Sequence, residues 1–290
     1  MTRFDYHEPT SLAEAVDLAA RFGGLARALA GGTDLMVQIQ HGRIAPRHVI
    51  ALRRVPGLDG VDVGARVTLG AGVTHRTIER TAAFAGPLAA LVEGAQVIGG
   101  HQVRNVGTVG GNLVNASPAA DLNPCLLALD ATVTLVGPGG ERDLPVGEFL
   151  LGPNRTARRS EEILTRVRFA ALPARTATAF LKAGRRRAME IAVVCVAVRL
   201  TLDGAGERCL EARIALGAVA PTALRARAAE RVLESAPVGP AAFARAAAAA
   251  QEACAPIDDV RASAGFRRHL VGVLVRRALE RGAARACAAA

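Results

Sequence analysis

The sequence of 290 residues predicts an α+β fold built from two domains. Short apolar runs and helical patterns alternate irregularly up to about residue 170, which argues against a regular doubly wound sheet. From residue 177 onward, three apolar runs are followed by three helical segments. Together with a turn-rich stretch after residue 152, this change in pattern predicts a first domain over 1–174 and a second over 175–290.

The first helix is predicted from its start signal. Ser11 and Glu14 have the spacing of a capping box, in which the serine hydroxyl accepts from a free amide and the glutamate reaches back. We expect this helix to run to about Phe22. A short apolar run over 25–30 then predicts a strand that stops at a glycine pair, and helical spacing resumes over 33–42.

The rest of the first domain follows from the same two signals, apolar runs for strands and helical spacing for helices. A glycine-rich region over 99–115 precedes an apolar segment over 122–129. The expected strands are 47–52, 61–64, 67–71, 132–136, 141–144 and 163–169, and the expected helices are 75–84 and 87–97.

The second domain is predicted to be a three-stranded antiparallel sheet under a helical layer, because three consecutive apolar runs precede three helical segments. The alanine-rich piece 241–250 is expected to be helical, since alanine is the best helix former. The strands are expected at 177–183, 191–201 and 208–219, and the helices at 222–234, 240–253 and 261–281.

Composition and charge exclude several classes of function. The net charge is +10, but arginine is spread over nearly every segment and aromatic residues make up 3%, so we expect no nucleic-acid partner. The five cysteines form no CxxC pair and the six histidines form no close pair, so no metal site is expected. No apolar stretch is long enough to span a bilayer and the start lacks a signal sequence, so we expect a cytoplasmic protein.

Two glycine turns carry the candidate chemistry. The first, 30–34, lies between a strand and a helix start, where unpaired amides and missing side chains let a phosphate approach. The second, 107–115, surrounds a Gly-Gly backbone with the polar side chains of Thr108, Asn112 and Asn115. Neither has the spacing of a P-loop or a Rossmann turn. For the first turn, an ordinary tight turn remains the alternative.

Lys182 is unusual in this composition. It is the only lysine among 36 basic residues, so arginine is used almost wherever a cation is needed. The sequence therefore indicates that a compact, flexible ammonium is required at this position. The alternative is that a single lysine persists by chance.

Five segments in order resemble one family. They are AGGTDL at 30–35, IGGHQVRNVGTVGGNLVNASPAAD at 98–121, EEIL at 161–164, FLKAGRRRAMEIA at 180–192 and DDVRASAGFRRHL at 258–270. Together they resemble the FAD-binding medium subunit of the xanthine and carbon monoxide dehydrogenases, the molybdenum hydroxylases. The resemblance implies a two-subdomain FAD-binding domain of the PCMH, or vanillyl-alcohol-oxidase-like, type, followed by a carbon monoxide dehydrogenase flavoprotein-like C-terminal domain.

The resemblance also implies a role for each matching residue. Since neither glycine turn contains a histidine or cysteine, we expect FAD to be held non-covalently. The 30–35 turn would wrap the pyrophosphate, Ile98 would pack on the adenine, Asn112 would donate to phosphate, and the 107–115 turn would line the phosphates and the isoalloxazine. Ile191 would cover the isoalloxazine face. Lys182 would place a cation near the flavin N1/O2 edge, as a tentative catalytic residue. The full implied set is Ala30, Gly31, Gly32, Thr33, Asp34, Leu35, Ile98, Gly107, Thr108, Gly110, Gly111, Asn112, Val114, Asn115, Asp121, Leu164, Lys182 and Ile191.

The family further implies partners. A large molybdopterin-binding subunit would oxidise the substrate, and a small subunit with two 2Fe-2S clusters would pass electrons to this chain, in a dimer of heterotrimers. The acceptor would be NAD+, a quinone or O2. Two alternatives remain open: a stand-alone FAD-dependent oxidoreductase of the same fold, for which we find no convincing acid or base over the flavin, and a basic binding protein that has lost FAD.

Overall fold

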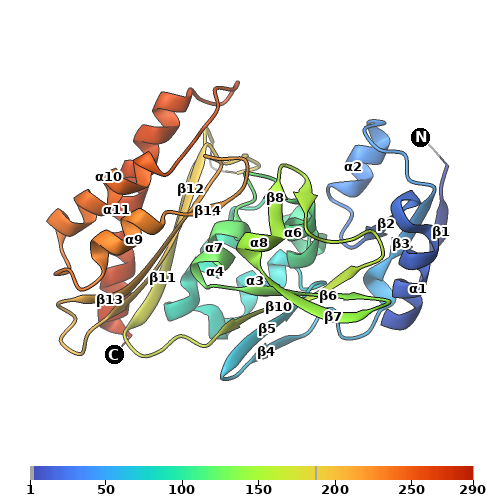
Figure 1. The fold of residues 1–290 in the computed structure, drawn as a ribbon, viewed down its shortest axis with the longest axis horizontal. Helices are drawn as coiled ribbons and strands as arrows, with labels where there is room; N and C mark the ends of the chain where they lie inside the picture. Colours follow the sequence, from blue (N-terminus) through green and yellow to red (C-terminus); the bar gives the residue numbers. More distant parts are fainter. Residues whose placement is uncertain (1–2, 187, 290) are drawn as a thin grey trace.

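The computed structural model describes residues 3–186 and 188–289 and has an α+β architecture of three layered units (Figure 1). A small parallel sheet lies at the N-terminal end, a larger antiparallel sheet with helices occupies the centre, and a third sheet backed by helices forms the C-terminal end. The predicted α+β class is confirmed. The boundary placed between 174 and 175 stays a prediction; these residues lie in the connection between two strands.

The N-terminal unit is a three-stranded parallel sheet with one covering helix. Ser11 caps this helix as predicted, accepting from the Glu14 amide at 3.1 Å, while the Glu14 carboxylate accepts from the Thr10 amide at 2.8 Å. The sheet order is β1-β3-β2, and β1 was missed because three residues are too few to show a period. The elements are β1 (Asp5–His7), α1 (Leu12–Phe22), β2 (Ala26–Leu29), α2 (Leu35–Gln40) and β3 (His48–Ala51).

The central unit is a five-stranded antiparallel sheet in the order β4-β5-β10-β6-β7, with short helices on one face. Its core contains fully buried Phe84, Leu126 and Phe149. The glycine-rich region 99–115 forms two short helices rather than turns alone. The elements are β4 (Val61–Val63), β5 (Arg66–Gly70), α3 (His75–Arg80), α4 (Ala89–Gln96), α5 (His101–Val106), α6 (Val109–Asn115), α7 (Leu122–Ala128), β6 (Thr132–Gly137), β7 (Gly140–Pro145), α8 (Val146–Phe149), β8 (Leu150–Gly152), β9 (Arg155–Thr156) and β10 (Ile163–Ala170).

The antiparallel sheet of the C-terminal unit has a fourth strand that was not predicted, and α9 (Arg227–Leu233) and α11 (Ala264–Ala288) differ in their bounds from the expected 222–234 and 261–281. The three long strands lie where predicted, and a two-residue strand pairs Leu224 with Leu216 inside the segment expected to begin the next helix. A strand this short leaves no alternation to read in the sequence. The elements are β11 (Thr176–Ala183), β12 (Val194–Leu202), β13 (Cys209–Gly217), β14 (Leu224–Arg225), α9 (Arg227–Leu233), α10 (Pro240–Glu252) and α11 (Ala264–Ala288).

This C-terminal sheet is buried on both faces. Val194, Val196 and Val198 belong to the core under α10 and α11, whereas Cys195 and Ala197 point into the core of the central unit. Alternate residues of one strand therefore enter two cores, as the period of two requires. The two halves of the chain share this sheet as a common layer, which positions loops from both halves around one site.

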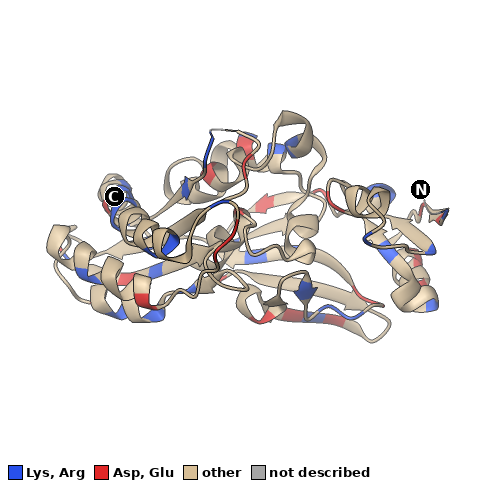
Figure 2. Cartoon of the chain, turned by 90° about the horizontal axis from the view of Figure 1, so that it is seen from above, with Lys and Arg blue, Asp and Glu red and all other residues tan. Residues whose placement is uncertain are grey.

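Charge is dispersed over the molecule, in line with the spread of arginine along the sequence. Figure 2 shows basic residues on the N-terminal unit, along the central sheet and on the C-terminal helices. Within the described ranges, no helix combines the length and the apolar character that crossing a membrane requires.

Candidate functional site

The two glycine turns meet backbone against backbone. A Cβ added at Gly31 would lie 1.9 Å from the carbonyl oxygen of Val106, so only glycine permits this approach. The helices that follow the two turns are joined as well, because Gln38 Nε2 donates to Asn115 Oδ1 at 3.3 Å. Two segments that are far apart in the sequence therefore form one surface.

The first turn supplies unpaired donors to that surface. Among the described residues, the amides of Gly31, Gly32, Thr33 and Asp34 donate to no backbone acceptor. Gly32 has φ +73°, a left-handed conformation that glycine adopts without strain. Successive amides in such a turn form a concave anion site. The predicted phosphate-binding character of this turn is therefore consistent with its geometry.

In the second turn, in contrast, most main-chain amides already donate to acceptors of the protein. The amides of Val109 and Gly110 donate to Val73 and Ala71, and the Gly111 amide donates to the Thr108 hydroxyl at 3.0 Å. The Thr108 side chain is thus the N-cap of α6. This turn can contribute side-chain groups and close approach to a ligand, but few main-chain donors.

Two observations on the second turn fit a bound ligand. The Asn112 side-chain oxygen is buried without a hydrogen-bond partner, which is costly unless a ligand group supplies one. At Gly111, which is exposed, an added Cβ would meet Thr108 Oγ1 at 3.1 Å and Ala30 Cβ at 4.0 Å. Gly111 therefore borders space on the shared surface that a side chain would fill.

Lys182 and Asp121 form a buried ion pair. Lys182 Nζ lies 2.7 Å from Asp121 Oδ2, and the two side chains are each 7% exposed. The ammonium also donates to the carbonyls of Val97 at 3.2 Å and Glu190 at 2.8 Å, so all three of its protons have acceptors. Burial raises the pKa of Asp121 to about 6, although the charge of Lys182 and its hydrogen bond lower it. The second carboxylate oxygen, Oδ1, is buried without a partner.

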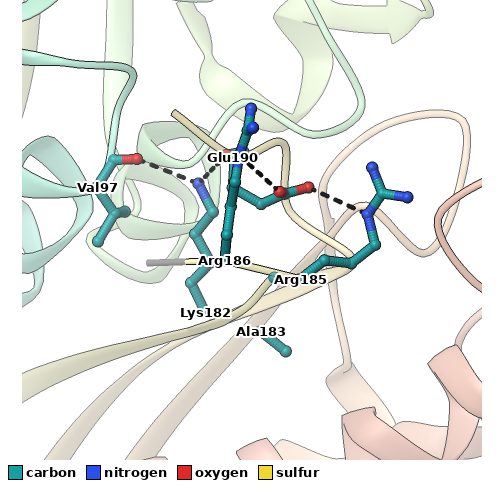
Figure 3. A pocket seen from close by; sticks show the side chains of 7 residues that line it. Val97, Lys182, Ala183, Arg185, Arg186 and Glu190 are labelled. Atoms are coloured by element: carbon teal, nitrogen blue, oxygen red, sulfur yellow. Dashed lines mark hydrogen bonds and ion pairs between the residues drawn. The ribbon is translucent and has the colours of Figure 1, made fainter. Parts of the chain in front are cut away.

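A cavity of about 420 Å³ opens beside this pair (Figure 3). Val97 and Lys182 line its inner part. Glu190 lies between two exposed arginines of its rim, with 3.7 Å to Arg185 Nε and 3.3 Å to Arg186 Nε. Lys182 therefore belongs to both the cavity and the ion pair, and Glu190, whose backbone carbonyl accepts from Lys182, lines the same cavity.

The other predicted site residues have different surroundings. Ile191 is 50% exposed and directly follows the cavity residue Glu190. Leu164 is buried in the central core, and Ile98 and Val114 are half-buried against the same core. The flavin contacts assigned to these four residues stay predictions.

Sequence reasoning missed two contributors to this site. The carbonyls of Val97 and Glu190 both accept from Lys182. Glu190 lies within the matching segment 180–192 but was given no role, and Val97 lies just outside the segment that begins at Ile98. It also assigned Asp121 and Lys182 separate contacts with the cofactor and did not foresee that they pair. The available signal was that Asp121 is the only carboxylate of the segment 98–121 and that Lys182 is the only lysine of the chain.

Comparison with known proteins identifies both halves of the chain. Residues 2–172 match the family model described as FAD binding domain in molybdopterin dehydrogenase, and residues 179–281 match the CO dehydrogenase flavoprotein C-terminal domain.

Full-length relatives agree with these matches. The carbon monoxide dehydrogenase medium chain of Afipia carboxidovorans is 35% identical, with 98% of each chain covered. The xanthine dehydrogenase FAD-binding subunit of Escherichia coli O157:H7 is 30% identical, with 97% of this chain and 96% of that one covered.

Solved structures of relatives have the same fold. Carbon monoxide dehydrogenase from Hydrogenophaga pseudoflava superposes with a TM-score of 0.93 at 35% identity, over 98% of each chain. Quinoline 2-oxidoreductase from Pseudomonas putida 86 gives 0.91 at 29% identity, also over 98% of each chain. The predicted family, the predicted fold class and FAD as cofactor are thereby confirmed. The chain belongs to the family of FAD-binding medium subunits of the molybdopterin dehydrogenases and is an oxidoreductase subunit.

Proposed function

We propose that this chain is the electron-transfer flavoprotein of a molybdenum hydroxylase. It accepts electrons from the 2Fe-2S clusters of a small subunit, after a molybdenum centre on a large subunit has oxidised the substrate, and delivers them to an external acceptor. Bound FAD supplies redox chemistry that can run in one- or two-electron steps. Relatives described as medium chains and FAD-binding subunits support this role over a stand-alone oxidoreductase.

The contact between the two glycine turns is the observation that carries the proposal. The four unpaired amides from Gly31 to Asp34 would hold the FAD pyrophosphate through the main chain. The buried Asn112 Oδ1 is an acceptor, so it would take its hydrogen bond from a hydroxyl or N–H group of the same ligand rather than from the phosphates. Lys182 and Asp121 would lie at the polar edge of the ring system, where charge changes on reduction.

Substituting Gly111 by valine tests the binding surface. An added Cβ would meet Thr108 Oγ1 at 3.1 Å, which a small shift of that side chain relieves, and the rest of the valine would lie on the surface that we assign to FAD. We therefore expect a folded protein with little flavin. Gly31 and Gly110 are unsuitable for this test, because a Cβ there would lie 1.9 Å and 2.6 Å from neighbouring protein atoms. The measurement is FAD released per chain by acid denaturation, alongside thermal unfolding.

Gly139→Val is the matched control. An added Cβ at Gly139 meets nothing within 4 Å, and this residue lies in the turn between β6 and β7, away from the glycine turns. We expect it to keep a full complement of FAD. Normal flavin content in a folded Gly111→Val chain would contradict the proposed binding surface.

The partners form the second testable part of the proposal. Native mass spectrometry of the complex that copurifies with a tagged chain should find a small two-cluster iron–sulfur subunit and a large molybdopterin subunit, as a dimer of heterotrimers. The isolated chain should show no substrate-dependent dehydrogenase activity. A native complex with neither subunit would contradict this role.

A further inference from the structure

The segment DDVRASAGFRRHL at 258–270 has no part in the site described so far. It is a tight turn followed by the start of α11. The Ala264 amide donates to Asp258 Oδ1 at 2.6 Å, and the Ser263 hydroxyl accepts from the Phe266 amide at 3.2 Å, so both residues cap this helix. The capping fixes the first turn of α11 and thereby the position of Arg267.

Arg267 is a buried cation with three acceptors on three different segments. Its side chain is 3% exposed. The guanidinium donates to the carbonyl of Val193 at 2.6 Å, to the carbonyl of Ala218 at 3.1 Å and to Asp259 Oδ1 at 2.6 Å. The planar head of arginine presents these donors in a fixed fork, a spacing that the compact ammonium of a lysine does not reproduce.

Asp259 is itself held in place. Its carboxylate accepts from the Arg261 amide at 2.8 Å and from the Arg261 guanidinium at 2.7 Å. Burial raises the pKa of Asp259, but the hydrogen bonds from the Arg261 amide and from Arg267 outweigh it and hold this pKa at about 2. The ion pair with Arg267 is therefore intact at every physiological pH.

The first acceptor of Arg267, the Val193 carbonyl, belongs to the last residue of the loop that carries the cavity residues Arg185, Arg186 and Glu190. Residues 184–193 connect β11 to β12, and the Val193 amide donates to the Ala183 carbonyl at 2.8 Å, which closes the loop at its base. Arg185 in the same loop donates to the Val260 carbonyl at 3.2 Å. The 258–267 segment thus contacts this loop near both of its ends.

The second acceptor of Arg267, the Ala218 carbonyl, belongs to a residue that is hydrogen-bonded to the segment carrying Asp121. The Ala218 amide donates to the Pro118 carbonyl at 2.8 Å, three residues before Asp121. Lys182 precedes the 184–193 loop and donates to the Glu190 carbonyl within it. Through two carbonyls, Arg267 is connected to the segments that carry both members of the Lys182–Asp121 pair.

We propose that Arg267 is a positioning residue for the flavin site. By holding the Val193 and Ala218 carbonyls, it fixes the 184–193 loop and the 118–121 segment, so that Glu190 and Ile191 keep their places beside the Lys182–Asp121 pair. The link to the flavin rests on the proposed function, whereas the effect on the loop does not.

The test compares Arg267→Met, Arg267→Lys and the control Arg277→Met, an exposed arginine of the same helix. Hydrogen-exchange mass spectrometry of the full chain should show exchange of the Val193 amide, which donates to the Ala183 carbonyl at the base of the loop, rising about tenfold or more in Arg267→Met, since the charge-assisted bond to the Val193 carbonyl is lost. The visible circular dichroism of bound FAD should change in parallel. Arg267→Lys should recover part of both signals, and Arg277→Met should match wild type.

Several outcomes would overturn the proposal. Unchanged exchange in 184–193, or a rise no larger than that in α10, would reduce Arg267 to a general stabiliser of the C-terminal unit. If Arg267→Met does not fold, Asp259→Asn weakens only one of the three contacts and should still raise exchange in the same loop. If that local rise in exchange were absent, the proposal would be wrong. A wild-type chain without flavin would contradict the proposed function, while the exchange result would still decide on the loop.

Discussion

Replacing Lys182 by methionine tests how the buried ion pair acts on the flavin that we place beside it. The ammonium is 7% exposed and pairs with Asp121, whose pKa is about 6 even with Lys182 present. Without that cation the carboxylate is buried and unpaired, so its pKa rises further. At neutral pH Asp121 therefore takes up a proton in the variant, and the net charge of the pair stays at zero.

The expected shift in the FAD reduction potential depends on pH for this reason. Near neutral pH, wild type and Lys182→Met should differ little. Above the raised pKa of Asp121, the variant has an uncompensated carboxylate near the ring. A unit charge in this position contributes about 1–3 kcal/mol. That corresponds to about 20–65 mV for a two-electron couple, with the potential shifted negative.

Spectroelectrochemical titration from about pH 6.5 to about pH 9.5 measures this. Asp121→Asn is the mirror variant: it leaves the ammonium uncompensated, so the potential should shift positive by about 20–65 mV near neutral pH. Lys182→Arg should recover part of the wild-type potential, limited by the fit of its larger planar head. Potentials equal to wild type in all three variants at every pH would refute the placement of this pair at the flavin edge.

Two further predictions concern the rest of the fold. Asp130 follows α7 and accepts from Arg199 at 3.1 Å and Arg213 at 2.8 Å on the C-terminal sheet. It also pairs with Arg225, is 46% exposed and has φ +50°, a conformation that asparagine adopts more readily than alanine. Asp130→Asn should therefore lower the free energy of unfolding by about 1 kcal/mol, and by less in high salt; chemical denaturation with Glu148→Gln as control measures this. Only Cys287 is exposed among the five free cysteines, so a thiol reagent should titrate one group in the native chain and five after unfolding.

The sequence was sufficient to locate the helices and strands that have long, regular hydrophobic patterns. The strands from β10 to β13 were located within a few residues, except that β12 begins at Val194 rather than 191, because the loop before it is also apolar at Ile191 and Ala192. The start of α1 was located by its cap. Short elements such as β1 and β14 could not be found, since their stability comes from neighbouring strands and not from their own residues.

The candidate site shows the same division. Each glycine turn can be recognised locally, but their contact depends on Gly31 lying against Val106, which no local pattern contains. Helices α5 and α6 were not expected in a glycine-rich region; the amides of Val109 and Gly110 are paired by distant carbonyls, and the fold stabilises these short helices. Lys182 stands out by composition, yet its pairing with Asp121 follows only from the packing of β11 near α7.

The distribution of FAD, iron and molybdenum among the subunits of the native complex is the sharpest test of whether this chain is the flavoprotein subunit. We would purify the complex through a tag on this chain, separate its subunits under mild conditions, and measure FAD, iron and molybdenum in each fraction. We expect about one acid-releasable FAD with this chain, and iron and molybdenum with its partners. Flavin found with another subunit, or iron or molybdenum retained stoichiometrically by this chain, would contradict it.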